Sequence, residues 1–142
     1  MTYDEKKLQM KDLCGRLPYG VKCYAYQYKI DGNDCECAGT LTGINGEYFY
    51  LSDRVSVNGG KTYDERYREV KPYLRPIKTM TEEESKELSK MGKTMFRKIS
   101  VALYKELANA DQIEWLNEHM FDYRGLIPMG LALEAPEDMY NN

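Results

Sequence analysis

The side chains that could carry out covalent chemistry in this chain are four cysteines and one histidine. A thiolate beside an imidazole base is the usual arrangement of a cysteine nucleophile, so His119 could in principle activate any of the four. No pattern in the sequence brings a cysteine to His119, and its position near the end of an expected helix favours a surface role beside the helix dipole. No serine lies in a nucleophile elbow of the Gly-x-Ser-x-Gly type. We identify no catalytic residue and predict that the chain is not an enzyme.

The same cysteines could bind zinc as thiolates. Cys14, Cys23, Cys35 and Cys37 follow the spacing C-x8-C-x11-C-x-C, whereas structural zinc sites generally use pairs separated by two to four residues. Cys35 and Cys37 would share one face of a strand, which does not suit a disulfide between them. The sequence therefore favours reduced, buried or half-buried thiols, with no metal and no cofactor, and zinc binding stays open as the alternative.

Patterns for phosphate binding and for glycoside hydrolysis are weak. Asn58-Gly59-Gly60-Lys61-Thr62 resembles the end of a phosphate-binding loop, but it lacks the upstream glycine that such a loop needs. A turn between two strands is the better interpretation of this segment. The carboxylates are numerous and unpaired in pattern, so they leave a two-acid glycosidase open without indicating one.

Tyrosine is the residue in excess, and it favours binding over catalysis: 13 tyrosines accompany three phenylalanines and one tryptophan. A tyrosine combines a large apolar body with a hydroxyl that needs a partner or water, so the excess indicates half-buried surface positions. Tyr24, Tyr26 and Tyr28 alternate along one stretch, and Tyr48 and Tyr50 along another. Residues two apart share a face of a β-strand. The pattern predicts tyrosine columns on the surface of a sheet.

The opposite face of the first tyrosine stretch would carry Val21, Cys23 and Ala25. We expect this small apolar face to be buried and the tyrosines to form a contact surface. A one-residue change of register would exchange the two faces. The contact surface would then move to the helices, with the segment 122–127 as the next candidate. The predicted binding residues are Tyr24, Tyr26, Tyr28, Tyr48, Tyr50, Arg66, Arg68 and Arg124.

Turn signals divide the first half of the chain into a helix and five strands. The helix is expected over residues 4–15, with Leu8, Leu13 and Cys14 facing inward. Asn45-Gly46 is the strongest hairpin signal, and the prolines at 72 and 76 predict a final edge strand or a turn that closes a barrel. The expected strands are Val21–Ile30, Cys35–Ile44, Glu47–Ser52, Val55–Val57 and Arg68–Leu74.

The second half of the chain is expected to be helical. Three-residue and four-residue steps between apolar positions predict the helices, and acidic or hydroxyl residues mark where they begin. The expected features are a capping box of Thr81 and Glu84 with a helix through Leu88, a helix between Met95 and Leu107, a helix capped by Asp111 that contains Trp115 and Leu116, a last helical turn from Asp122 to Ile127, and a frayed acidic tail over residues 135–142.

These elements predict an α+β fold, with a small bent antiparallel sheet or an SH3-like or OB-like barrel between an N-terminal helix and a C-terminal helical segment. Residues 1–78 would hold the N-terminal helix and the small barrel, and residues 79–142 a helical segment packed on it, as one structural unit. A chain of 142 residues is long enough to bury a single core without a disulfide or a metal.

The charge and the hydropathy of the chain indicate which kinds of partner to expect. The net charge is −3 and the pI about 5.3, which gives no overall attraction to nucleic acid or to an anionic membrane. No apolar run approaches a membrane span, and the first residues lack a secretory signal, so we expect a cytoplasmic protein without a membrane partner. Lysines and arginines between Leu88 and Lys105 meet no acidic residue. They form either a basic strip for phosphate groups or a helix face that pairs with the acidic C-terminal part.

Four stretches of the chain resemble a group of small uncharacterised proteins carried by phages, prophages and mobile elements of Bacteroides-type gut bacteria. The resemblance covers both ends and the sheet, but not residues 90–111. It implies expression in the cytoplasm of a bacterial host cell, and no catalytic residue comes with it. The stretches are Leu17–Lys22, Thr40–Ile44, Val70–Pro76 with Thr81–Glu84 after it, and Phe121–Ile127 continuing to Gly130–Pro136.

The sequence thus leads to three hypotheses about function. The first is a non-enzymatic, host-directed binding protein that contacts a host protein or a defence component through its tyrosine-rich sheet face. The second is recognition of a nucleotide or of single-stranded nucleic acid, including sequestration of a signal nucleotide, because tyrosines stack on bases and arginines bind phosphates. The third is a structural homo-oligomer that buries the tyrosine face between copies.

Overall fold

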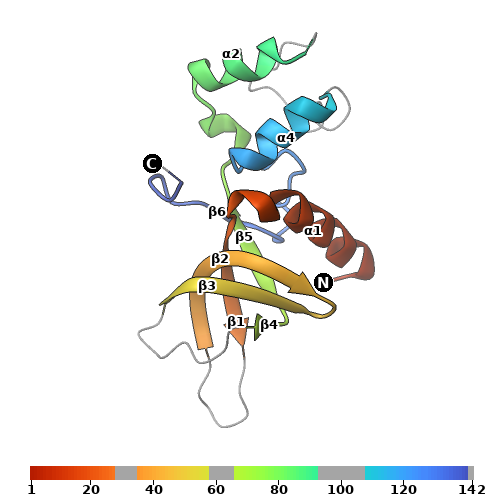
Figure 1. The fold of residues 1–142 in the computed structure, drawn as a ribbon, viewed down its shortest axis with the longest axis vertical. Coiled ribbons are helices and arrows are strands. Elements are labelled where there is room, and N and C mark those ends of the chain that lie inside the picture. The colour runs from red at the N-terminus through yellow and green to blue at the C-terminus, as the bar shows by residue number, and fades with distance from the viewer. Residues whose placement is uncertain (28–34, 58–65, 93–107, 141–142) are drawn as a thin grey trace.

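The chain forms a mixed α+β structure in which a bent sheet, a helix across one end of the sheet and a pair of shorter helices follow one another along the long axis (Figure 1). The computed structural model describes residues 1–27, 35–57, 66–92 and 108–140. Its elements are α1 (Tyr3–Arg16), the 3-10 helix η1 (Leu17–Tyr19), β1 (Lys22–Gln27), β2 (Cys35–Asn45), β3 (Tyr48–Ser56), β4 (Arg66–Tyr67), β5 (Val70–Leu74), the 3-10 helix η2 (Ile77–Thr79), α2 (Glu82–Lys90), α4 (Ala110–Glu118) and β6 (Leu133–Glu134).

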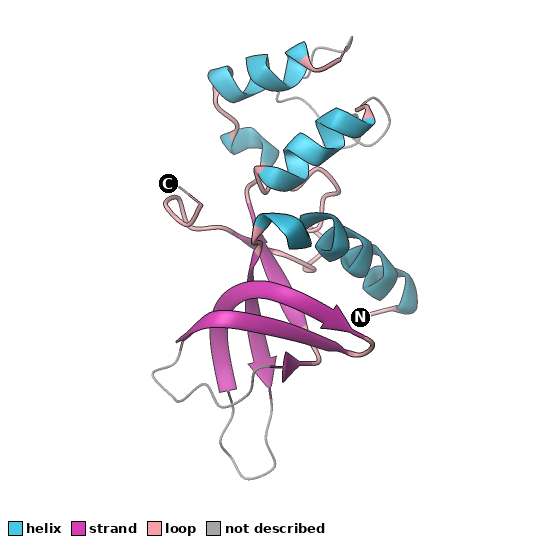
Figure 2. Ribbon diagram, viewed as in Figure 1, coloured by secondary structure: helices cyan, strands magenta, loops and turns pink. Residues whose placement is uncertain are grey.

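The sheet has six strands in the order β4-β3-β2-β1-β5-β6. Figure 2 shows the strands in magenta and the helices in cyan. The segment that runs from β4 into β5 pairs with β3 at its start and with β1 at its end. The bend of the sheet therefore brings β3 and β1 to the same segment. The sheet nevertheless stays open, and of the two predicted forms it is the bent sheet rather than a closed barrel. The predicted antiparallel pairing is confirmed from β4 to β5, and the two-residue strand β6 is added to β5 in parallel.

The hairpin between β2 and β3 was predicted from Asn45-Gly46, and the structure places its loop one residue later. Asn45 and Tyr48 pair directly, which leaves Gly46 and Glu47 as the two loop residues. Gly46 has a φ of +60°, a left-handed conformation that glycine adopts without the steric cost a side chain would add. The hairpin itself is confirmed.

β3 is one strand where the sequence predicted two, Glu47–Ser52 and Val55–Val57. The pairing with β2 moves from Thr40–Ser52 to Ala38–Val55, so β3 contains one more residue than its partner over this interval. Asp53 lies in the interval with a φ of +52°. Such an irregularity is a β-bulge, which bends a strand without ending it. The sequence indicates a break instead, because the alternation of residue types fails at this point.

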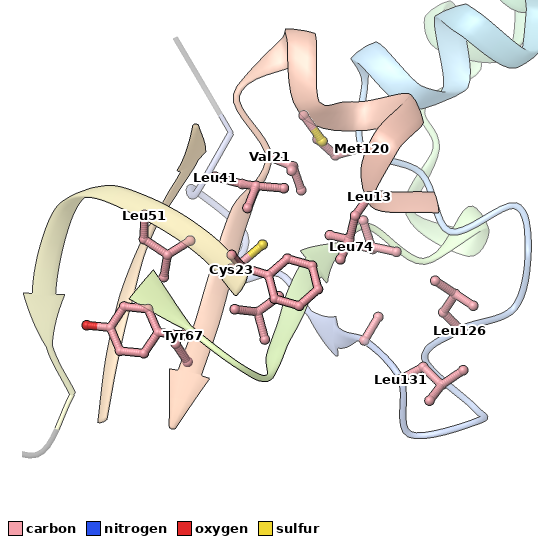
Figure 3. Close-up of a cluster of buried hydrophobic side chains, with 14 of the residues drawn as sticks. Leu13, Val21, Cys23, Leu41, Leu51, Tyr67, Leu74, Met120, Leu126 and Leu131 are labelled. Atoms are coloured by element: carbon pink, nitrogen blue, oxygen red, sulfur yellow. The ribbon is translucent and has the colours of Figure 1, made fainter. Parts of the chain in front are cut away.

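The main core lies between the concave face of the sheet, α1 and the C-terminal segment (Figure 3). Strands β1 to β5 supply its strand residues, and Met120, Leu126, Leu131 and Ala132 add residues from the C-terminal part of the chain. Residues from before and after position 78 therefore share this core. Its largest fully buried side chains include Leu13, Leu41, Tyr67, Leu74 and Met120.

Helix α1 differs from its prediction in the residues that it turns inward. Leu13 is fully buried and Leu8 half-buried, but Cys14, which was expected to face inward, is exposed. The buried stripe instead contains Gln9, Asp12 and Arg16. These positions are three and four residues apart and so share one face of the helix. Cys14 lies outside that stripe, which explains why its prediction was wrong.

A second, smaller core holds α2, α4 and η2 together. Leu88, Trp115, Leu116 and Phe121 are buried in it. The predicted capping box of α2 is confirmed, since the Thr81 hydroxyl accepts the Glu84 backbone N–H over 3.1 Å and the Glu84 carboxylate accepts the Thr81 backbone N–H over 3.0 Å. The helix expected between residues 95 and 107 lies outside the described residues, as does most of the basic strip.

Two predictions about the last helices need correction. Helix α4 begins after Asn109, whose side chain accepts the Gln112 backbone N–H over 2.8 Å, so Asn109 and not Asp111 is its cap. The last helical turn predicted from Asp122 to Ile127 is absent, because residues 123–124 and 126–130 form turns and none of residues 122–127 is helical. The Asp122 carboxylate accepts the backbone N–H groups of Leu126 and Ile127. It therefore caps a turn, as an aspartate often does, rather than a helix.

The acidic end of the chain is attached to the sheet. Ala135 donates its backbone N–H to the Leu74 carbonyl over 2.8 Å, and the Tyr140 hydroxyl contacts the backbone of Lys22 and Tyr73. Leu133–Glu134 forms β6 just before it. The frayed tail predicted over residues 135–142 is thus wrong up to Tyr140. Local composition indicates fraying, whereas contacts with residues more than 60 positions away hold the segment.

Candidate functional site

Tyrosines form the outward face of β1, in the register that the sequence favoured. Val21, Cys23 and Ala25 have no exposed surface, while Tyr24 is half-buried and Tyr26 is 46% exposed. The alternative register, with the tyrosines inside, is therefore wrong. Tyr28 lies outside the described residues.

The tyrosines of β1 belong to a block that extends across three strands. Tyr24 pairs with Ala38 of β2, and Ala38 pairs with Val55 of β3. Residues directly opposite each other in antiparallel strands project from the same face and contact one another. Tyr26 pairs in the same way with Glu36, and Val57 donates its backbone N–H to the Glu36 carbonyl. We call this block, Tyr24, Tyr26, Glu36, Ala38, Val55 and Val57, the Tyr24 face.

A hydrogen bond and electrostatics fix one tyrosine of this face. The Tyr24 hydroxyl donates to the Glu36 carboxylate. Partial burial, together with that bond and the negative charge of Glu36, raises the pKa of Tyr24 to about 12. Tyr24 is therefore protonated at neutral pH, and its ring is held at a defined place on the face.

Four of the predicted binding residues meet at the other end of the sheet. The Arg66 guanidinium lies over the Tyr48 ring, with 4.7 Å between its central carbon and the ring centroid, and the corresponding distance for Arg68 is 5.7 Å. Arg68 also donates to the Tyr48 hydroxyl over 3.5 Å. Tyr50 lies beside them, because it pairs with Arg66. We call these four residues the Tyr48 group.

The structure separates the two sets of tyrosines that the sequence placed on one surface. Tyr24 reaches β2 at Ala38, and Tyr50 reaches it at Gly43. Five residues of strand correspond to about 17 Å at a rise of roughly 3.3 Å per residue. The Tyr24 face and the Tyr48 group are therefore two surfaces near opposite ends of β2.

Arg124, the last predicted binding residue, belongs to the interior. Its guanidinium donates to the Asp12 carboxylate over 2.7 Å and its side chain is 12% exposed. Asp12 also accepts two hydrogen bonds from Arg16, and both of these residues are fully buried. Arg16 in turn donates to the Phe121 carbonyl over 2.6 Å. These hydrogen bonds attach α1 to the turn after α4, so the role of Arg124 in this network is to stabilise the fold.

Sequence reasoning missed this buried network and half of the Tyr24 face. Asp12 and Arg16 are four residues apart on α1, a spacing that signals an ion pair, but it does not reveal that the pair is buried. Val55 and Val57 were predicted to lie in a strand, but the sequence did not indicate on which face of the sheet. The reason is that the extra residue at Asp53 shifts the alternation of inward and outward side chains. Without it Val55 would share a face with the buried Leu51.

The cysteines and the histidine form no metal centre in the ranges of the chain that the structure describes, where no three side chains of cysteine, histidine, aspartate or glutamate gather in a way that could hold a metal ion. Cys14, Cys23 and Cys37 are not in disulfides, and the Cys37 thiol donates to the Tyr67 hydroxyl over 3.2 Å. Burial raises the pKa of Cys23. The His119 ring stacks on Trp115 at the end of α4, with 3.9 Å between centroids.

The fold and the surface together define a small α+β protein with an amphipathic face on an open, bent sheet. Comparisons with protein-family models, with curated proteins and with solved structures found no match. Among the helices that the structure describes, none combines the length and the apolar character that crossing a bilayer requires.

Proposed function

We propose that this chain is a non-enzymatic protein-binding module that contacts its partner through the Tyr24 face. The observation that carries the proposal is a block of exposed apolar side chains on one face: Tyr26 is 46%, Val55 67% and Val57 51% exposed. Single exposed apolar residues are ordinary, whereas a contiguous group of them is characteristic of an interaction site. Here the cross-strand pairing makes the group contiguous.

The chemistry of the face indicates what kind of partner would fit. Tyrosines give a large contact area at low cost in side-chain entropy, and they are enriched where binding energy concentrates. The bond from Tyr24 to Glu36 lowers that cost further, because one ring is already held in place. Glu36 adds a negative charge within an otherwise apolar block. We infer a partner with an apolar patch and a basic or hydrogen-bond-donating group near its centre.

The biological setting that we propose rests on the resemblance to proteins of phages and mobile elements. A small phage protein without a catalytic site commonly acts on its host by binding a host protein. The partner would then be a host protein or a defence component in the bacterial cytoplasm.

Quantitative affinity enrichment tests the proposal. The tagged chain would be expressed in a host lysate, and the retained proteins would be compared by mass spectrometry between the wild type and the variants Val55→Glu and Tyr26→Ser. Tyr3→Ser is the matched control, because Tyr3 is 80% exposed on α1. A partner retained by the wild type and by Tyr3→Ser, and reduced at least about tenfold (roughly 1.4 kcal/mol) by Val55→Glu, is the expected result. Equal retention by all four proteins would contradict it.

The Tyr48 group supports a second candidate, binding of a nucleotide or of single-stranded nucleic acid. Two guanidiniums lie over one half-buried aromatic ring, and arginines in pairs bind phosphate well. The two candidates differ in their response to salt. Binding through phosphates weakens steeply as salt rises, whereas docking on the Tyr24 face would change little. A third outcome, association of copies of the chain through the Tyr24 face, would appear in light scattering as an oligomer that Val55→Glu dissolves.

A further inference from the structure

A pocket of about 390 Å³ is lined by residues of the start of α1, of the loop of the β2–β3 hairpin and of the connection from β4 to β5. Its volume falls within the range of about 300–1,000 Å³ that small-molecule sites occupy. The pocket is distinct from the Tyr24 face, and the inference drawn from it does not depend on the proposed function.

The feature that identifies the pocket as a site is the side chain of Gln9. Gln9 is 4% exposed and lines the pocket. Its amide nitrogen donates to the Val70 carbonyl over 3.0 Å and to the Leu131 carbonyl over 2.8 Å. A side-chain amide has two N–H donors, so both are used, and the two carbonyl acceptors fix which end of the amide is nitrogen.

The amide oxygen of Gln9 is therefore the polar atom left for a ligand. In the part of the chain that the structure describes, this oxygen accepts no hydrogen bond. It is not sealed inside the protein either, since among the described side chains the one fully buried polar atom without a partner is Nη1 of Arg16. An acceptor on the wall of a pocket binds a ligand that donates an N–H or O–H group. Gln9 thus favours a ligand of this pocket that donates an N–H or O–H group.

Charged side chains of both signs line the pocket. Lys6 and Arg68 are basic, and Glu47 and Glu69 are acidic. Within 4.0 Å, neither Lys6 nor either glutamate has an ion-pair partner among the described residues. Glu47 acts on Arg68 at longer range, but among the described residues these four side chains form no ion pair with one another. Each can therefore also interact with a charge on a ligand. Two carboxylates also disfavour a phosphate or other multiply charged anion.

The remaining wall of the pocket is apolar. Phe49, which is 7% exposed, and the half-buried Met10 line it. Methionine is flexible and polarizable, and so adapts to apolar groups of different shape. A ligand that fills this pocket would therefore carry an apolar group next to its charged groups.

We propose that the pocket binds a small zwitterion of the α-amino acid type with an apolar side chain. The ammonium group donates to the Gln9 oxygen and lies near the carboxylates of Glu47 and Glu69. The carboxylate of the ligand pairs with Arg68, and its side chain packs on Met10 and Phe49. Each of these three parts of the ligand is complementary to one feature of the pocket.

Calorimetric and NMR titration of the full chain tests this proposal. The probes are L-leucine, L-methionine and L-phenylalanine, each with its amine analogue that lacks the carboxylate and its acid analogue that lacks the ammonium. We expect at least one amino acid to saturate the protein with a dissociation constant below about 1 mM, and both of its analogues to bind at least about tenfold more weakly. The two side-chain amide proton resonances of Gln9 should shift on binding.

Variants locate the site. Glu69→Gln and Arg68→Gln change exposed side chains and should each weaken binding about tenfold or more (roughly 1.4 kcal/mol). Lys7→Gln, an exposed position on α1 outside the pocket lining, is the control and should bind as the wild type does. The proposal is overturned if no amino acid saturates the protein with a dissociation constant below about 1 mM. Binding of an amine analogue as tight as that of its amino acid, or unchanged binding by Glu69→Gln and Arg68→Gln, would overturn it too.

Discussion

Arg124 donates a hydrogen bond to the carboxylate of Asp12 across 2.7 Å, although the two residues are 112 positions apart in the chain. Asp12 lies on α1 and Arg124 on the turn after α4, so this contact joins the two ends of the sequence. Asp12 is the shared acceptor, because Arg16 binds the same carboxylate. Arg16 already has one buried nitrogen, Nη1, without a partner among the described residues.

The first prediction concerns this shared carboxylate. Asp12→Ala leaves the guanidinium of Arg16 buried without its carboxylate partner, which should lower the free energy of unfolding by about 3–5 kcal/mol. Chemical denaturation of the two proteins measures the difference. Lys11→Ala, at an exposed neighbouring position on α1, should change stability by less than about 0.5 kcal/mol. A loss below about 1 kcal/mol for Asp12→Ala would show that the network does not stabilise the fold in this way.

The second prediction concerns the close approach of β2 to β3. A Cβ atom added at Gly39 would lie 2.8 Å from the Ser52 carbonyl oxygen, which is backbone and cannot rotate away. The nearest atom to a Cβ at Gly43, also in β2, would be 3.8 Å away. Gly39→Ala should therefore destabilise the protein by about 1–3 kcal/mol, and Gly43→Ala by clearly less. Thermal unfolding of the two variants measures this difference, and an equal loss in both would contradict the pairing of β2 with β3 described above.

The third prediction uses the difference between two thiols. Cys14 is exposed on α1, whereas Cys23 is fully buried in β1 and burial raises its pKa. Because the thiolate is the reactive form, a maleimide should modify Cys14 at least about tenfold faster than Cys23 in the native protein. Peptide mapping by mass spectrometry after a short pulse of reagent measures both rates. In denaturant the two rates should converge, and convergence without denaturant would place Cys23 at the surface.

The fourth prediction concerns acid stability. Burial raises the pKa of Glu84, but the hydrogen bonds from Arg75 and Thr81 outweigh it, so the pKa lies below the ordinary value of 4.5. A carboxyl group whose pKa is lower in the folded state stabilises the protein above its unfolded-state pKa, and this contribution disappears as pH falls through the folded-state pKa. Glu84→Gln should therefore be less stable than the wild type near neutral pH, with the difference shrinking below about pH 4.5.

Denaturation curves at several pH values test that dependence. Glu83→Gln is the matched control, since Glu83 is the exposed neighbour of Glu84 in the first turn of α2. Its stability difference from the wild type should be small throughout. If the Glu84→Gln difference were the same at neutral pH and in acid, the ion pair with Arg75 would not be its source.

Local patterns in the sequence predicted those parts of the fold that depend on neighbours in the chain. The alternation from Val21 to Tyr26 indicated the correct buried face of β1, and Thr81 with Glu84 marked the start of α2. Both signals arise within a few residues, where strand alternation and helix capping operate. The glycine at position 46 likewise indicated the hairpin.

Features that depend on distant partners were not predictable in the same way. Nothing local to Leu133 indicates that it pairs with β5, and nothing local to Arg124 indicates a buried partner on α1. The Tyr24 face was half-predicted, because the tyrosines alternate visibly while the bulge at Asp53 hides the outward position of Val55. The pocket was missed altogether, since it is assembled from three separate segments.

Site-specific photo-crosslinking in cells tests most directly whether the Tyr24 face contacts another protein. A photoreactive phenylalanine derivative would replace Tyr26 or Val55, both exposed on that face, and Tyr3 on α1 as the control. We expect one discrete protein adduct that positions 26 and 55 share and that is absent from position 3. Adducts from all three positions alike, or none from positions 26 and 55, would contradict the proposed function.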